Sequence, residues 1–167
     1  MRDREQLLTL AIELRDRLKD LEVICQHGEQ WLDIHSVKAP GILDLRALGS
    51  ILHDFYTAIE GIFELIAGDI NGKIPQDSRW HKRLLHLMTL DIPKLRPAVI
   101  SKELEAQLDD YLRFRHVFRN VYGHQLQWAR MSSLIHNLDC TCKKVTQEIE
   151  TFRRFLLRLA EQLEEDV

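Results

Sequence analysis

An apolar repeat near the C-terminus limits the possible folds of this chain more than any other feature. Between residues 131 and 163, apolar side chains recur at alternating intervals of four and three positions. The positions are Met131, Ile135, Leu138, Cys142, Val145, Ile149, Phe152, Leu156, Leu159 and Leu163. This alternation places them along one side of a long helix that packs lengthwise against other helices. The repeat therefore predicts a long final helix in an all-α bundle.

The other segments predict partners for this helix. A similar seam from about residue 2 to residue 34 predicts a long first helix, with Leu7, Ala11, Leu14, Leu18, Leu21 and Cys25 facing inward. After the break at Pro40 and Gly41, a second long helix is predicted from Ile42 to Ala67.

A short helix is predicted from Asp77 or Ser78 through Leu90, and Ser101 is predicted to cap a fourth helix after an irregular connection over residues 91–100. No strand-like alternation is present. We expect a single domain over residues 1–167, folded as an up-and-down antiparallel bundle of four long helices plus one short helix.

Charge and composition exclude several classes of protein. With a net charge of −3, the 167-residue chain does not have the basic surface of a general nucleic-acid coat, although a local basic site remains compatible. The three cysteines form neither a disulfide framework nor a zinc pattern, and no apolar run is long enough for a membrane span. We expect a cytoplasmic protein with no metal, no cofactor, no membrane association and no DNA partner.

One segment has a strong local excess of positive charge. No acidic residue occurs between Asp110 and Asp139, whereas this segment contains Arg113, Arg115, Arg119 and Arg130 and three histidines. One interpretation is a solvated or dimer-facing arginine surface. The other is a phosphate-binding surface on which aromatic residues stack against bases. The aromatic candidates are Tyr111, Phe114, Tyr122 and Trp128.

The six residues from Arg119 to His124 resemble the R-x4-6-H motif of HEPN-domain ribonucleases, including the polar residue that this family favours after the arginine, here Asn120. Residues 114–118 and the bundle layout resemble the HepT-type toxins of that superfamily. The resemblance implies a metal-independent endoribonuclease toxin with a composite site in a homodimer, 2′,3′-cyclic phosphate products and a nucleotidyltransferase antitoxin. The implied catalytic residues are Arg119, Asn120 and His124, and the predicted RNA-binding residues are Arg113, Arg115, His116, Tyr122 and Arg130.

Spacing alone does not single out this motif, because Arg46…His53, Arg79…His86 and Arg130…His136 have similar spacings. The acid-free segment and the position between two helices favour Arg119 and His124. In one continuous helix these two side chains would point about 140° apart. We therefore predict a break at Gly123, with the last helix beginning near His124.

Two hypotheses remain open from the sequence. The HepT-type toxins carry a tyrosine two residues after the histidine, which the antitoxin modifies with AMP, whereas this chain has Leu126 there. Tyr122 or Tyr111 could replace it as the acceptor, or the antitoxin could mask the site directly. The competing hypothesis is an inactive helical module that binds a partner nucleotidyltransferase or a nucleotide. His116 is an in-chain alternative for a second proton carrier.

Overall fold

The computed structural model of the protein describes residues 3–35, 39–122 and 125–165. For residues 164 and 165 it describes only the backbone. Its helices are α1 (Arg4–Ile34), α2 (Ile42–Ile66), α3 (Trp80–Met88), α4 (Lys102–Phe118) and α5 (Trp128–Glu165), and a π-helical turn, η1 (Ala67–Asn71), extends α2. The described residues contain no strand. The prediction of an all-α helical bundle is confirmed.

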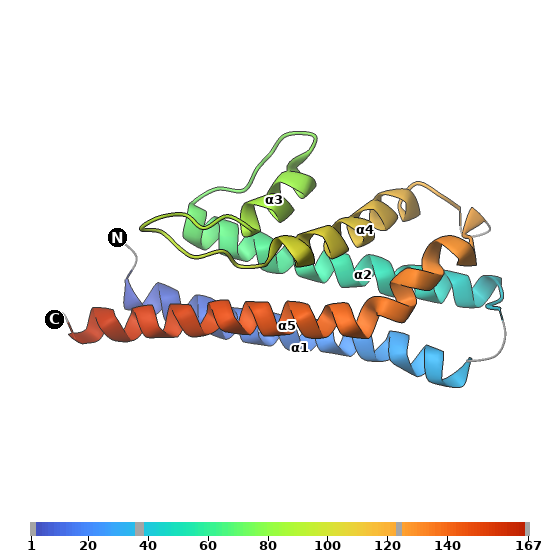
Figure 1. The fold of residues 1–167 in the computed structure, drawn as a ribbon, viewed down its shortest axis with the longest axis horizontal. Coiled ribbons are helices and arrows are strands. Elements are labelled where there is room, and N and C mark those ends of the chain that lie inside the picture. Colours follow the sequence, from blue (N-terminus) through green and yellow to red (C-terminus); the bar gives the residue numbers. More distant parts are fainter. Residues whose placement is uncertain (1–2, 36–38, 123–124, 166–167) are drawn as a thin grey trace.

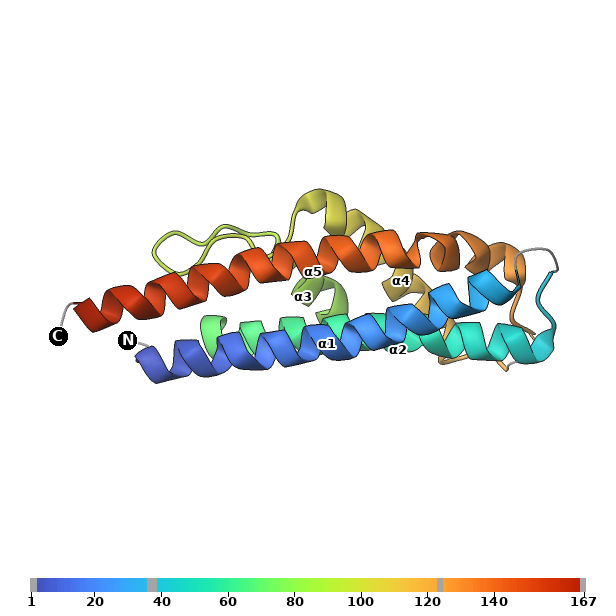
Figure 2. The same cartoon turned by 90° about the horizontal axis from the view of Figure 1, so that it is seen from below.

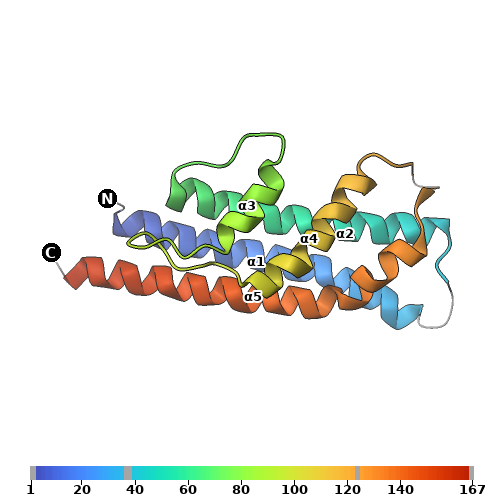
Figure 3. The same cartoon turned by 45° about the horizontal axis from the view of Figure 1, so that its top comes forward.

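The bundle is elongated, and its long helices follow one axis. Figure 1 shows α1, α2 and α5 running along the molecule, with both termini at the same end. In the view from below in Figure 2, α1 runs obliquely across α2, and α5 extends along the opposite edge of the bundle. In Figure 3, α3 and α4 both lie over one side of this layer, with α4 crossing it obliquely. The α4–α5 connection therefore lies at the end opposite the termini.

The two predicted apolar seams are buried, and they pack against each other. All six predicted seam residues of α1 are buried, and α5 buries its seam from Met131 to Leu156, while Leu159 and Leu163 are half-buried. These two helices contact each other along their length. Periodic apolar spacing predicted that each seam needs a lengthwise partner, whereas the pairing of α1 with α5 is seen only in the tertiary structure.

Capping explains where most helices begin. Ser101 caps α4 as predicted, its Oγ accepting a 3.1 Å hydrogen bond from the amide of Leu104. By contrast, α3 begins at Trp80, later than the predicted Asp77 or Ser78. Asp77 stabilises the preceding turn instead, because its carboxylate accepts from the amide of Arg79 at 2.9 Å.

Gly49 lets the α4–α5 connection pack tightly on α2. A Cβ atom at Gly49 would lie only 2.6 Å from Cε2 of Phe118 and 3.4 Å from Cδ1 of Leu126. Phe118 is the last residue of α4, and Leu126 is buried just before α5. The absence of a side chain at Gly49 therefore positions both ends of the connection that contains the predicted motif.

Candidate functional site

The predicted break in the helix is present. Helix α4 ends at Phe118 and α5 begins at Trp128, so no continuous helix joins Ser101 to Met131. The break begins at Arg119, earlier than the predicted position at Gly123. Gly123 and His124 lie outside the described residues. The prediction that the last helix starts near His124 is wrong, since α5 begins four residues later in the sequence.

Arg119 and Asn120 lie on the surface directly after α4. The amide of Arg119 donates to the carbonyl of Arg115 at 3.2 Å, which continues the helical pattern for one more residue. The side-chain amide of Asn120 donates to the carbonyl of His116 at 2.8 Å. Asn120 thus satisfies one of the carbonyls that a helix leaves without partners at its C-terminus. Two of the three predicted catalytic residues are therefore held at the end of a well-defined helix.

The predicted RNA-binding residues divide into two groups. Arg113, His116, Tyr122 and Arg130 are exposed, and 75% of the surface of Tyr122 is accessible. Arg113 forms a 2.6 Å ion pair with Asp109 on its own helix. These four side chains are available on the surface near the two ends of the α4–α5 connection.

Arg115 differs from the other predicted RNA-binding residues, because the structure places it in the interior. It is 8% exposed, and its Nη1 lies 2.9 Å from Oε1 of Glu60 on α2. The sequence prediction relied on its charge, whereas its position on the inward face of α4, beside Tyr111 and Leu112, determines its burial. Its guanidinium neutralises a buried carboxylate and does not face the surrounding solvent.

Glu60 connects Arg115 to a histidine of α3, and we refer to Glu60, His81 and Arg115 as the buried ion cluster. Nδ1 of His81 donates to Oε2 of Glu60 at 2.5 Å. The exposed fractions of the side chains are 14% for His81 and 5% for Glu60. Nδ1 of His81 also lies 3.4 Å from Nη1 of Arg115. Glu60 thus contacts His81 through the Nδ1 atom of the ring, and its other oxygen contacts Arg115.

Aromatic rings enclose this cluster. The ring of Trp80 stacks on that of His81 with 3.7 Å between centroids. Cζ of Arg115 lies 6.0 Å from the ring centroid of Tyr56. Burial, together with the charge of Glu60, raises the pKa of Tyr56 well above its ordinary range. Low exposure and aromatic walls reduce the local dielectric screening, so charges in this region influence one another strongly.

His116 links the buried ion cluster to the surface beside Arg119. Its ring meets that of His81 edge-on, with a centroid distance of 5.3 Å and an interplanar angle of 76°. Partial burial lowers the pKa of His116, and the charge of His81 lowers it further. Arg115 and Arg119 act in the same direction, whereas Glu60 raises it. The neutral form of the His116 imidazole is therefore favoured.

Sequence reasoning missed Glu60 and His81. The available signal was the position of Glu60, which lies among apolar residues of α2 between Ile59 and Ile62, where a carboxylate needs a buried partner. The described part of the chain contains no group of three candidate metal ligands. The partners of Glu60 come from α3 and α4, which sequence periodicity does not identify.

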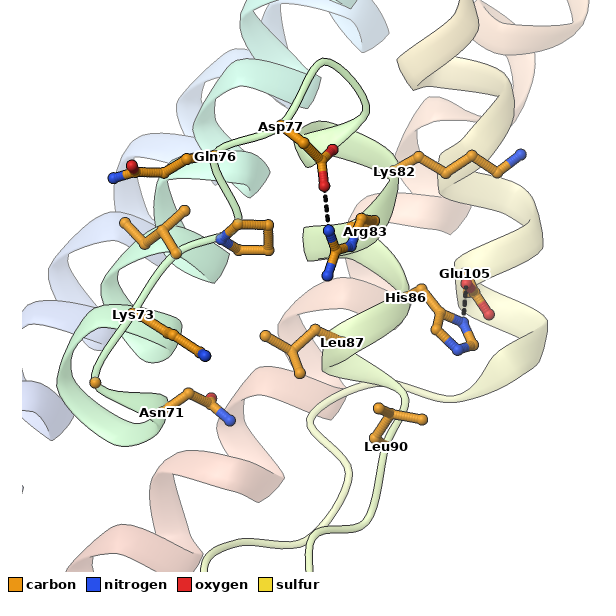
Figure 4. A pocket seen from close by; sticks show the side chains of 13 residues that line it. Asn71, Lys73, Gln76, Asp77, Lys82, Arg83, His86, Leu87, Leu90 and Glu105 are labelled. Atoms are coloured by element: carbon orange, nitrogen blue, oxygen red, sulfur yellow. Dashed lines mark hydrogen bonds and ion pairs between the residues drawn. The ribbon is translucent and has the colours of Figure 1, made fainter.

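A cavity of about 1160 Å³ lies elsewhere, between α3 and the segment from Asn71 to Asp77. Figure 4 shows the Asp77–Arg83 ion pair on one side and the His86–Glu105 pair on the other, with His86 Nδ1 3.0 Å from Oε1 of Glu105. Neither Arg119 and Asn120 nor any of the predicted RNA-binding residues lines this cavity. Among the described residues, no helix is both long and apolar enough to cross a membrane.

Comparison with known proteins identifies one related family. A family model described as HepT-like protein matches residues 47–156. The match covers more than half of the chain and contains the buried ion cluster, the α4–α5 connection and most of α5. No curated protein and no solved structure shows significant similarity to the chain.

Proposed function

This chain belongs to the HepT-like family of the HEPN superfamily, and on that basis we propose that it is a metal-independent endoribonuclease that acts as the toxin of a toxin–antitoxin pair. The observation that carries this proposal is the break between α4 and α5 at the R-x4-6-H motif. Arg119 and Asn120 are exposed there, inside the segment that matches the family. The break removes the opposed orientation that a continuous helix would impose on Arg119 and His124.

The proposed reaction is attack of an RNA 2′-OH on the adjacent phosphate. It needs a base for the 2′-OH proton and an acid for the leaving 5′-oxygen, and each typically contributes about 10²–10⁴ in rate. In this proposal His124 transfers protons, Arg119 stabilises the charge of the transition state, and Asn120 orients the phosphate. The products are a 2′,3′-cyclic phosphate and a 5′-hydroxyl.

A two-fold homodimer would supply two copies of these residues to one cleft. One copy of His124 cannot serve as base and acid in the same step. The exposed Arg113, His116, Tyr122 and Arg130 surround the α4–α5 connection and are proposed to contact the RNA. Arg115 is not proposed to contact the RNA, because its side chain is only 10% exposed and is paired with Glu60.

The proposed antitoxin is a nucleotidyltransferase, and the structure bears on where it could act. Leu126, at the position of the family tyrosine, is only 9% exposed. Tyr111 is also buried, and its hydroxyl donates to the carbonyl of Leu134 at 2.9 Å. Tyr122 is therefore the proposed acceptor if the antitoxin transfers AMP, and direct masking of the site needs no acceptor.

Cleavage of RNA by the purified protein in EDTA tests the proposal. We expect cleavage by the wild type, and losses of about 10²–10⁴ for His124→Ala and about 10²–10³ for Arg119→Ala. Arg79→Ala and His86→Ala are matched controls, since they change the same residue types at a similar spacing on α3. Expression of the wild type should arrest growth, and His124→Ala should relieve the arrest.

Three results would contradict parts of this proposal. Intact RNA with wild-type protein would favour the helical module that only binds a partner nucleotidyltransferase or a nucleotide. Activity that disappears in EDTA would exclude the metal-independent mechanism. A persistent monomer in sedimentation experiments, with full activity, would exclude a site shared between two protomers.

A further inference from the structure

The buried ion cluster has features that exceed a structural role. Glu60 accepts from both His81 and Arg115, so a carboxylate with a 5% exposed side chain has a partner on each oxygen. Nε of Arg115 is nevertheless buried and has no hydrogen-bond partner within the described residues. An unsatisfied buried donor costs about 1–3 kcal/mol, and apolar residues could fill the same volume at equal or better stability. The cluster is therefore an expensive way to hold three helices together.

The hydrogen bond to Glu60 orients His81 in a defined way. A carboxylate that accepts from Nδ1 fixes the plane of an imidazole ring. Trp80 further restricts this ring by stacking on it at 3.7 Å. His81 in turn meets the ring of His116 edge-on at 5.3 Å. The cluster thus fixes the position of the ring that packs against the exposed His116.

His116 lies in the last turn of α4, and Arg119 and Asn120 follow the end of that helix. They follow His116 by three and four positions, which is the spacing of neighbours on a helix surface. The contact between Asn120 and the carbonyl of His116 confirms that these residues adjoin. The charge of Arg119 also acts on the His116 ring.

We propose that His116 is a second proton carrier of this site, and that Glu60, His81 and Arg115 position it and adjust its basicity. The inference rests on the proposed ribonuclease function. His116 accepts the proton of the 2′-OH as the O2′–P bond forms. The P–O5′ bond then breaks, and the leaving O5′ takes a proton from a second imidazolium, for which His124 is the candidate. Base and acid are thus two different histidines of the sequence, and either protomer of the proposed dimer can supply His124.

The charges around His116 come from every helix that packs beside it. Glu60 approaches from α2 and His81 from α3, while Arg115 and Arg119 belong to the end of α4. Burial and the charge of Glu60 raise the pKa of Glu64, one turn after Glu60, whereas His81 and Arg115 lower it. Removing a positive neighbour should raise the pKa of His116, and removing the negative one should lower it. The two changes therefore have opposite signatures.

Cleavage rates across a pH series test the inference. His116→Ala should lose about 10²–10⁴ in rate, and added imidazole should restore part of it. The rate should fall on the acidic side as His116 becomes protonated. His81→Gln should move this acidic limb to higher pH, and Glu60→Gln should move it to lower pH. Titration of the His116 ring by NMR, without RNA, should show the same two opposite shifts.

Matched controls come from the pair of His86 on α3 and Glu105 on α4. His86→Gln and Glu105→Gln make the same chemical changes and should leave the acidic limb in place. If Arg119→Ala abolishes cleavage but His116→Ala retains wild-type rates, the inference fails and the proposed function survives. If the wild type does not cleave RNA, the proposed function fails and the catalytic role of His116 fails with it. Shifts in the same direction for both cluster variants would show a merely structural cluster.

Discussion

Two histidines of α3 each pair with a carboxylate of another helix, His81 with Glu60 of α2 and His86 with Glu105 of α4, and the two pairs have very different surroundings. His81 and Glu60 approach to 2.5 Å, with side chains 14% and 5% exposed. His86 and Glu105 approach to 3.0 Å, with side chains 57% and 25% exposed. The first pair also contacts Arg115, whereas the second lines an open cavity. Burial, and not the mere presence of a pair, therefore determines how strongly the charges of a histidine and a carboxylate interact.

The largest expected difference between the pairs is in stability. Glu60→Ala leaves Arg115 buried without its counterion, and breaking a buried pair in this way costs about 3–5 kcal/mol. Glu105→Ala removes an exposed pair and should cost about 0–1 kcal/mol. Urea unfolding of both variants measures the difference. The double variant Glu60→Leu/Arg115→Met should recover most of the loss, and similar midpoints for the two single variants would contradict the comparison.

The close approach of α2 to the end of α4 depends on Gly49. In Gly49→Ala the new methyl group would meet Phe118 at 2.6 Å, and overpacking of this kind costs about 1–3 kcal/mol. Gly68→Ala is the matched control, because a Cβ at Gly68 meets nothing within 4 Å. Thermal unfolding should separate the two variants. Equal stability would show that Phe118 moves aside without cost.

Salt should affect the two pairs differently. The Debye length falls to about 3 Å at 1 M salt, so the interaction of His86 with Glu105 should become negligible there. Double-mutant cycles for this exposed pair should give about 0.2–1 kcal/mol at low salt. The coupling between His81 and Glu60 should change little over the same range. A salt-sensitive His81–Glu60 coupling would show that solvent reaches the cluster.

The smallest expected effect concerns pH and stability through His116. Its pKa in the folded protein is lowered, so below the ordinary histidine value of about 6.5 the unfolded chain binds the proton first. Stability is therefore fully present above that pH and is lost as pH falls through the folded pKa. His116→Asn should flatten the acidic slope in urea unfolding, whereas His86→Asn should leave that part of the slope unchanged. An unaltered slope in His116→Asn would argue against a lowered pKa.

Much of the site was accessible from the sequence because its signals are local. The acid-free segment and the motif indicated Arg119 and Asn120, and both are exposed at a helix break. The charge of Arg115 was also visible, but charge alone indicated a surface position. Its actual partner is Glu60, 55 positions away in numbering (115 − 60), on another helix. No local rule relates these two residues.

The sequence by itself determined the helices of this protein, their inward faces and the break after α4. Apolar periodicity, caps and helix-breaking residues act within a few positions, so they can be interpreted without knowing the neighbours. Only the tertiary structure decided that Glu60, His81 and Arg115 meet in the interior while His86 and Glu105 remain exposed. Those outcomes depend on how α2, α3 and α4 pack, and packing sets the solvation that gives each charge its effect.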